Sequence, residues 1–187
     1  GTSQMPKICP DGNGGVFVVY DESGVTYGID GLHYTHIDAN GTRSFSPVYI
    51  DLHTSRYNYR QRIINAGSNR AVVLYTSEEA GVDNVKVALL DNQGNVSIQP
   101  VRAGKFGDMI MTLSGTHLMV AVGTDEPGSS TDVYLHKFDI DNLNEVWTGK
   151  AYADTSTNAS VSTIPRVVVD TAGDSYVVWH SMAEGGG

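Results

Sequence analysis

The sequence is poor in cysteine, in basic residues and in long apolar segments. Its single cysteine, Cys9, excludes an intramolecular disulfide and a zinc site built from cysteines. Lys and Arg number 12 against 21 Asp and Glu, and the resulting net charge of −9 disfavours binding to nucleic acid or to anionic lipid. Polar residues interrupt every apolar segment, although 40% of the chain is hydrophobic. We therefore expect a soluble globular chain with no nucleic-acid partner and no membrane insertion.

Catalytic motifs are also missing. The chain holds no Gly-x-Ser-x-Gly elbow, no phosphate-binding P-loop and no His-Glu-x-x-His zinc motif. His33 and His36 are three residues apart, and on a strand they point to opposite faces, so they cannot chelate one ion together. Cys9 has no arranged base beside it and is expected to be a structural thiol. These absences favour a protein that is not an enzyme.

What the chain does contain is glycine, tyrosine and an internal repeat. The 21 glycines and the 10 tyrosines favour many turns and half-exposed strands. Four segments each lead from a polar or glycine-containing turn into a β-branched or aromatic strand. These segments are residues 12–20, 68–75, 115–122 and 173–180. Their spacing of about fifty residues is typical of a blade-sized repeat unit.

Each repeat unit predicts several antiparallel strands. A further strand precedes each of the four segments, at 6–8, 59–65, 107–112 and 164–170. Downstream, an acidic turn ends the third strand, at Asp38, Asp91 and Asp139. The side chains of these aspartates are expected to accept backbone N–H bonds in the turn. The dipeptide Asn40-Gly41 predicts a type I′ hairpin.

The repeats divide the chain into units at about 6–58, 59–104 and 105–163, with an incomplete unit at 164–187. One four-stranded sheet buries too little by itself, so we expect repeated meanders that stack as in a β-propeller, with about three and a half blades. A β-sandwich is the alternative fold. The incomplete unit leaves an edge strand open. We therefore expect either that the natural protein is larger or that a partner completes this unit.

Residues 6–41 carry a family resemblance. They contain a proline, an Asp-Gly-x-Gly-Gly turn, an apolar strand that ends in an aromatic residue, and an aromatic strand followed by Asp-x-x-Gly. This pattern resembles a propeller-type repeat common in secreted and cell-surface bacterial proteins. Residues 22–27 distantly resemble the Asp-box of sialidase-type propellers, with Glu in place of Asp and Tyr in place of Trp. The resemblance implies a propeller fold and an extracellular or cell-surface location, but not one activity, because such repeats occur in adhesins, binding modules and enzymes.

Two tyrosine-rich stretches, 20–34 and 53–62, hold the candidate ligand-binding residues, because aromatic rings suit contact with sugar or protein. These candidates are Tyr27, Tyr34, Tyr57, Tyr59, Arg60 and Arg62. Tyrosines that simply cover the sheet faces are the alternative. Calcium is the one cofactor suggested, by the alternating oxygen ligands Asp139, Asp141 and Asn144, although an acidic hairpin loop explains these residues as well.

The sequence therefore predicts a non-catalytic structural or adhesive module that contacts protein or glycan. A first alternative is a fragment of a propeller glycoside hydrolase, whose two carboxyl groups the sequence does not identify. A second alternative is a subunit of an extracellular filament or appendage that self-assembles through the incomplete C-terminal unit.

Overall fold

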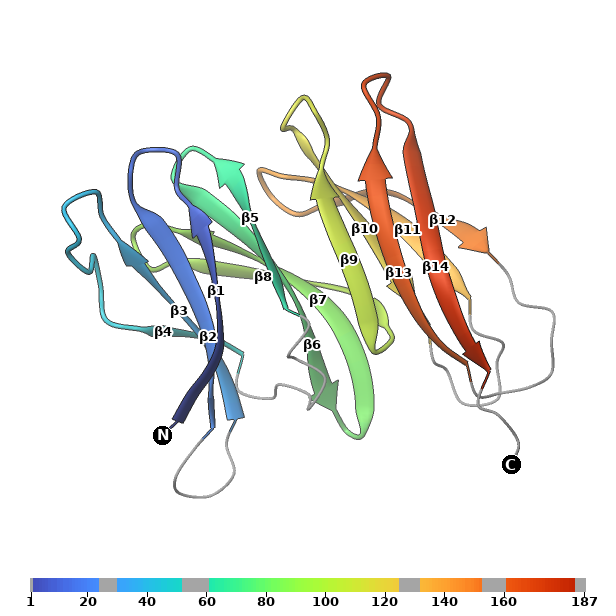
Figure 1. Cartoon of the computed structure of the whole chain (residues 1–187), viewed down its shortest axis with the longest axis horizontal. Helices are drawn as coiled ribbons and strands as arrows, with labels where there is room; N and C mark the ends of the chain where they lie inside the picture. Colours follow the sequence, from blue (N-terminus) through green and yellow to red (C-terminus); the bar gives the residue numbers. More distant parts are fainter. Residues whose placement is uncertain (1, 24–29, 52–60, 125–131, 153–160, 184–187) are drawn as a thin grey trace. The chain divides into compact units, whose positions relative to one another are not determined.

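The structure is a computed structural model that describes residues 2–23, 30–51, 61–124, 132–152 and 161–183 (Figure 1). Its described residues form strands and turns, and no helix. Accordingly, none of these residues belongs to a helix that is long and apolar enough to cross a membrane. The strands are β1 (Thr2–Pro10), β2 (Val16–Ser23), β3 (Asp30–Ile37), β4 (Val48–Asp51), β5 (Arg62–Gly67), β6 (Arg70–Glu79), β7 (Val82–Asp91), β8 (Val96–Ala103), β9 (Phe106–Met111), β10 (His117–Gly123), β11 (Val133–Asp139), β12 (Glu145–Tyr152), β13 (Val161–Val169) and β14 (Ser175–Ala183).

The strands pair in chain order and form four separate antiparallel sheets. Strands β1–β4, β5–β8 and β9–β12 form three four-stranded sheets, and β13–β14 form a two-stranded sheet. We call them the first, second, third and fourth sheets. The prediction of an all-β chain of repeated four-stranded meanders is confirmed, with an incomplete fourth unit among the described residues.

Four aspartate turns recur between paired strands with the same geometry. Asp11, Asp38, Asp91 and Asp170 each begin a turn whose fourth residue is a glycine with positive φ. In each turn the aspartate Oδ1 accepts N–H bonds from the residues two and four positions later. This confirms the expected capping role of Asp38 and Asp91, because the carboxylate satisfies backbone donors that the ladder leaves unpaired.

The type I′ hairpin predicted at Asn40-Gly41 is wrong. Gly41 has φ 79°, but Asn40 is not among the residues with positive φ. The turn instead closes from Asp38 with a bond from Gly41 N to Asp38 O of 3.0 Å. Capping by Asp38 therefore decides the turn type, and a single glycine supplies the left-handed residue.

The chain divides into two compact units, residues 1–81 with 86–99, and residues 82–85 with 100–187. In the first unit, one core lies between the first and second sheets. Phe17 and Val19 of β2 pack with Ala71, Val73 and Tyr75 of β6, and all five are almost fully buried. Burial of each large apolar side chain stabilises the fold by about 1.5–3 kcal/mol.

In the second unit, a smaller core joins the third and fourth sheets. Met119 and Ala121 of β10 and Leu135 of β11 pack with Val167 of β13. Asp108 on β9 also accepts a hydrogen bond of 3.1 Å from the backbone N–H of Val167. The face of β13 that carries Val167 is therefore the face turned toward the third sheet.

The central strands β6 and β10 are buried on both faces. Residues 71–77 of β6 and 118–123 of β10 are all buried, which matches their nearly continuous apolar sequence. The first and fourth sheets differ from this pattern, because each carries exposed apolar side chains.

Candidate interaction surface

The fourth sheet exposes an apolar face. Val168, Tyr176 and Val178 are 54%, 54% and 64% exposed. Val168 pairs with Tyr176, and Arg166 pairs with Val178, so these four side chains lie on one face of the two-stranded sheet. We call Arg166, Val168, Tyr176 and Val178 the end face. A contiguous apolar patch of this kind marks an interaction site more often than isolated exposed residues do.

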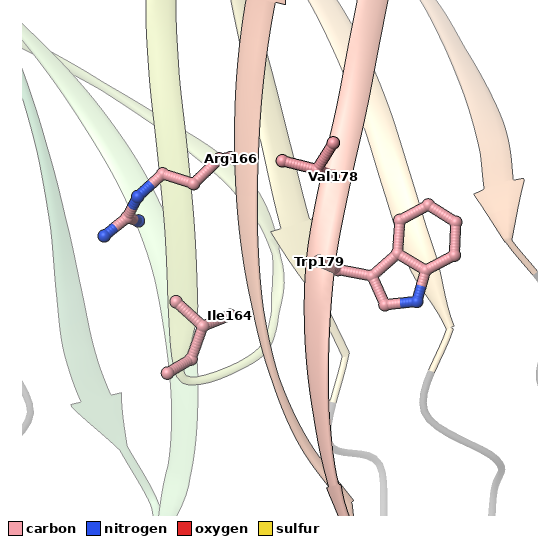
Figure 2. Close-up of a pocket in the computed structure, with 4 residues that line it drawn as sticks. All are labelled: Ile164, Arg166, Val178 and Trp179. Atoms are coloured by element: carbon pink, nitrogen blue, oxygen red, sulfur yellow. The ribbon is translucent and has the colours of Figure 1, made fainter.

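An open hollow of about 360 Å³ lies on the fourth sheet. Its lining residues are Ile164 and Arg166 of β13 and Val178 and Trp179 of β14. Figure 2 shows Ile164 and Arg166 extending to the same side of β13, while Trp179 extends to the other side of β14. The guanidinium of Arg166 donates to the carbonyl of Pro165. The surface thus combines an apolar floor with one positive charge.

Strand β14 also has an open edge. It pairs along its whole length with β13, and no strand in the described part of the chain pairs with its other edge. Unpaired backbone N–H and C=O groups at such an edge are a template for addition of another strand.

The first sheet exposes a second apolar face, on the side away from the second sheet. Ile8 is 68% exposed and Tyr49 is 55% exposed. The buried imidazole of His33 lies between two tyrosine rings. Its ring centroid is 5.5 Å from that of Tyr20, in a stacked arrangement, and 3.9 Å from that of Tyr49, in a tilted one. We call Ile8, Val18, Tyr20, His33 and Tyr49 the front face.

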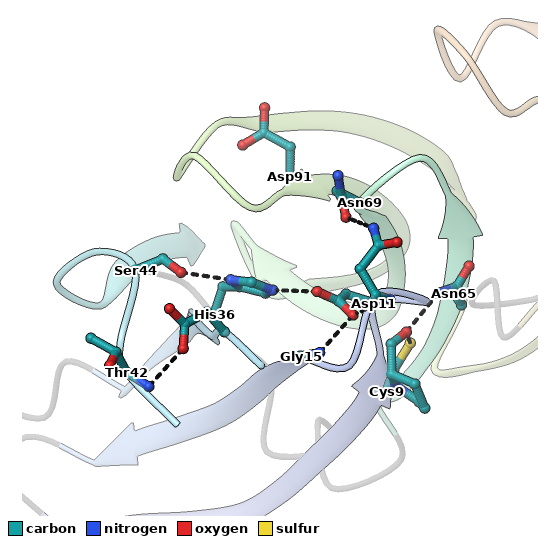
Figure 3. A network of polar contacts seen from close by, with 12 residues as sticks. Cys9, Asp11, Gly15, His36, Thr42, Ser44, Asn65, Asn69 and Asp91 are labelled. Atoms are coloured by element: carbon teal, nitrogen blue, oxygen red, sulfur yellow. Dashed lines mark hydrogen bonds and ion pairs between the residues drawn. The ribbon is translucent and has the colours of Figure 1, made fainter. Parts of the chain in front are cut away.

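The first unit also contains a polar network (Figure 3). His36 Nε2 lies 3.0 Å from Asp11 Oδ2, and His36 Nδ1 lies 2.7 Å from Ser44 Oγ. This network has the composition of a Ser-His-Asp triad, but the N–H of Ser44 donates to the carbonyl of His36. That amide is therefore not available to an oxyanion hole, which acyl transfer requires. The arrangement acts as a clamp between the β1–β2 turn and the loop after β3.

Further hydrogen bonds connect the β1–β2 strands and turn to the second sheet, and close packing at the clamp leaves no room for a side chain at one position. Asn65 Nδ2 donates to the carbonyl of Pro10 at 2.6 Å, and Asn13 Nδ2 donates to Asn69 Oδ1. A Cβ at Gly15 would lie 2.6 Å from Asp11 Oδ2, so only glycine fits there. These hydrogen bonds thus help to fix the position of the first sheet relative to the second sheet.

Hydrogen bonds and burial shift the acidity of two groups at the clamp. The backbone N–H of Asn13 lowers the pKa of Asp11, and the hydrogen bonds from His36 and Gly15 act in the same direction, whereas partial burial opposes them. Burial, with the nearby charge of Asp11, raises the pKa of the Cys9 thiol to about 11. Cys9 is therefore a protonated core residue at neutral pH, as the sequence predicted.

A buried ion cluster lies between the first and second sheets. Lys86 Nζ lies 3.2 Å from Asp51 Oδ2 and also contacts Glu79, and the hydroxyl of Tyr75 donates to Asp51 at 3.2 Å. Burial lowers the pKa of Lys86, but the hydrogen bonds and charges of Glu79 and Asp51 outweigh it and leave the pKa raised. No local sequence pattern predicts this cluster, because its members come from β4, β6 and β7.

A second buried cluster, in the second unit, centres on His136. Its Nδ1 lies 2.6 Å from Glu145 Oε1, and Arg102 lies 3.4 Å from its Nε2 while stacking over the ring of Tyr134 at 3.6 Å. Burial lowers the pKa of His136, and the attraction of Glu145 compensates only in part. The cluster pairs a neutral imidazole with a guanidinium held on an aromatic face.

Of the residues predicted to bind ligand, Tyr34 lies in the core. It is fully buried and its hydroxyl donates to the carbonyl of Asn95 at 2.8 Å, so its ring presents no face to a ligand. Side chains alternate between the two faces of a strand, so the sequence allowed Tyr34 to lie on either face of β3. Packing against the second sheet places it on the buried face. Arg62 begins β5 and is half-buried. Tyr27, Tyr57, Tyr59 and Arg60 lie outside the described residues.

The acidic residues proposed for calcium take part in turn contacts. Asp139 Oδ1 accepts the N–H of Asp141, and the N–H of Asn144 donates to Asn142 Oδ1. Within the described ranges, no three His, Cys, Asp or Glu side chains gather as metal ligands would. His33 and His36 lie on opposite faces of β3, as predicted, one in the front face and the other in the clamp.

Comparisons with known proteins identify the fold. No protein-family model and no curated protein sequence matches the chain. Among solved structures, the chain is similar to the β-propeller domain of the Trilobed protease from Pyrococcus furiosus, which is described as having an open velcro topology. That similarity has a TM-score of 0.50 and 10% identity, and it covers 98% of this chain and 59% of that one. An acylaminoacyl peptidase is also similar, with a TM-score of 0.49 and 11% identity over 97% of this chain and 32% of that one.

The chain thus spans about three fifths of the first structure and one third of the second. The likeness to the first structure shows a β-propeller-type fold, which confirms the fold predicted from the repeats. At this level of identity the likeness extends to architecture alone.

Proposed function

We propose that this chain is a non-catalytic interaction module, a propeller-type segment that binds protein through the end face of its fourth sheet. The observation that carries the proposal is the exposure of Val168, Tyr176 and Val178, three large side chains on one sheet face. Burying such a surface against a partner releases water from apolar area, which is the main favourable contribution to protein association. The open edge of β14 adds backbone donors and acceptors beside the same face.

The setting that we propose is extracellular or cell-surface. It is supported by the resemblance of residues 6–41 to a repeat of secreted and surface bacterial proteins, and by the net charge of −9, which limits non-specific binding to nucleic acid. The Asp11–His36–Ser44 clamp has the composition of a catalytic triad, but Asp11 and Ser44 form hydrogen bonds with the backbone of neighbouring strands and turns. This arrangement supports a non-catalytic role.

Site-directed photo-cross-linking tests the proposal. A photo-reactive phenylalanine analogue replaces Val178 in one variant and Ala172, an exposed residue of the β13–β14 turn, in a control variant. We expect a discrete cross-linked adduct from position 178 in extracts of the source, lost when Val168→Asp is added. Equal adduct patterns from both positions would contradict the proposal. Turnover of fluorogenic glycosides by the chain would favour the hydrolase alternative instead.

A further inference from the structure

The aspartate turns allow the first and fourth sheets to be aligned residue by residue. Asp11 and Asp170 occupy the same turn position, with the same pair of backbone donors two and four residues later. Counting from these aspartates, Val168 corresponds to Cys9, Tyr176 to Phe17 and Val178 to Val19.

The corresponding residues differ completely in exposure. Cys9, Phe17 and Val19 are 3%, 0% and 0% exposed because they pack against the second sheet, whereas Val168, Tyr176 and Val178 are at least half exposed. The end face of the fourth sheet is therefore the face that, in the first unit, packs against a following sheet. The chemistry of its natural partner can be read from what packs there.

In the first unit, that partner surface is Ala71, Val73 and Tyr75 of β6. When the repeat segments 12–20 and 68–75 are aligned at their last residues, Tyr20 corresponds to Tyr75 and Val18 to Val73. Val18 and Tyr20 belong to the front face. The front face therefore carries the same kind of side chains as the face of the second sheet on which the first sheet packs.

A comparison of the opposite faces of the first and fourth sheets leads to the same conclusion. Ile8 corresponds to Val167, which is 4% exposed and packs against the third sheet, whereas Ile8 is 68% exposed. Among the described residues, no sheet packs on the front face and none packs on the end face. The two faces are complementary in the repeat, and the chain carries one of each.

We propose that the end face of one copy of this chain packs on the front face of a second copy, head to tail. This inference rests on the proposed function, because it names the partner of the same end face. In the contact, Tyr176 and Val178 lie against Val18 and Tyr20, as Phe17 and Val19 lie against Val73 and Tyr75 within one chain. Arg166 of the end face meets the tyrosine rings of the front face, a cation–π pairing that the chain already uses between Arg102 and Tyr134.

Because the contact joins two different faces, it is heterologous. Such a contact does not end at a dimer unless the assembly closes on itself, so each added copy offers a new end face or front face. This property allows a decisive mixing experiment with two variants.

Val178→Asp damages the end face and leaves the front face intact, whereas Ile8→Asp does the reverse. Leu113→Asp is the matched control, because Leu113 is as exposed as Ile8 and belongs to neither face. All three positions are exposed, so the variants should fold, and circular dichroism with thermal melting checks this. The sedimentation velocity of the 187-residue chain is then measured over a wide concentration range.

We expect the wild-type chain and Leu113→Asp to associate as concentration rises. Val178→Asp alone and Ile8→Asp alone should each associate at least about tenfold more weakly, since each loses one buried apolar contact and gains a charge. An equimolar mixture of the two should form a heterodimer, through the one intact end face and the one intact front face.

Other outcomes overturn the inference in recognisable ways. Association lost in Val178→Asp but retained in Ile8→Asp, with no heterodimer in the mixture, would indicate pairing of two end faces. A wild-type chain that stays monomeric at every concentration would overturn self-association. In that case a cross-link from position 178 to a different protein would leave the proposed function standing, whereas the absence of any specific cross-link would overturn both.

Discussion

His36 Nε2 lies 3.0 Å from Asp11 Oδ2, with both side chains at most 5% exposed, although the two residues are 25 positions apart. The contact links the β1–β2 turn to β3, and Ser44 extends it to the loop that follows. Asp11 occupies a turn position that recurs at Asp38, Asp91 and Asp170, in the first, second and fourth sheets, but among these described turns only Asp11 has a histidine partner.

Replacement of His36 by Ala tests the clamp. The variant leaves a buried Asp11 oxygen without its side-chain donor, so the free energy of unfolding should fall by about 1–3 kcal/mol. Urea titration followed by far-ultraviolet circular dichroism, which reports on the strands of both units, measures the change. Ser44→Ala, which removes only the exposed end of the network, should cost less than about 1 kcal/mol. Equal losses in the two variants would argue against a buried clamp.

Acid should weaken the aspartate turns. Burial raises the pKa of Asp91, but the hydrogen bonds from Asn95 and Gln93 outweigh it and leave the pKa below the ordinary 3.8. A carboxyl group with a lowered folded-state pKa adds stability above its ordinary pKa, and this stability is lost as pH falls through the folded-state pKa. Urea midpoints at a series of pH values below neutral should therefore decline less steeply in Asp91→Asn than in the wild type. A parallel decline in both would show that Asp91 does not contribute.

Sequence reasoning succeeded where the signal is short-range. The strand segments and the capping of Asp38 and Asp91 follow from residues within a few positions of each other. The His36–Asp11 contact and the Lys86 cluster join separate strands, so no local pattern predicts them. Tyr34 shows a related limit, because alternation along a strand does not say which face meets a neighbouring sheet.

Removal of Lys86 should destabilise the first unit. In Lys86→Met, the carboxylate of Asp51 stays largely buried without its ammonium partner, so the free energy of unfolding should fall by about 3 kcal/mol. Glu79→Gln is the control with a smaller effect, because Glu79 is 58% exposed. The raised pKa of Lys86 means that its contribution is present below the ordinary 10.5 and is lost as pH rises through the folded-state value. A Lys86→Met variant as stable as the wild type would show that the cluster contributes no net stability.

His136 should titrate below the ordinary histidine value of 6.5, because burial disfavours its charged form. Its contribution to stability is then present above 6.5 and is lost as pH falls from that value through the folded-state pKa. NMR titration of the imidazole C–H signals measures the pKa, with His136→Asn to assign the resonance. A pKa above 6.5 would mean that Glu145 dominates over burial and Arg102.

The measurement that tests the central claim most directly is hydroxyl-radical footprinting of the tyrosines at low and at high protein concentration. The account predicts that Tyr176, which is 54% exposed, is oxidised readily in the dilute chain and becomes protected as the chain associates, whereas buried Tyr34 is protected throughout. If Tyr176 were as protected as Tyr34 in the dilute chain, or were oxidised equally at both concentrations, the end face would not be the interaction surface described.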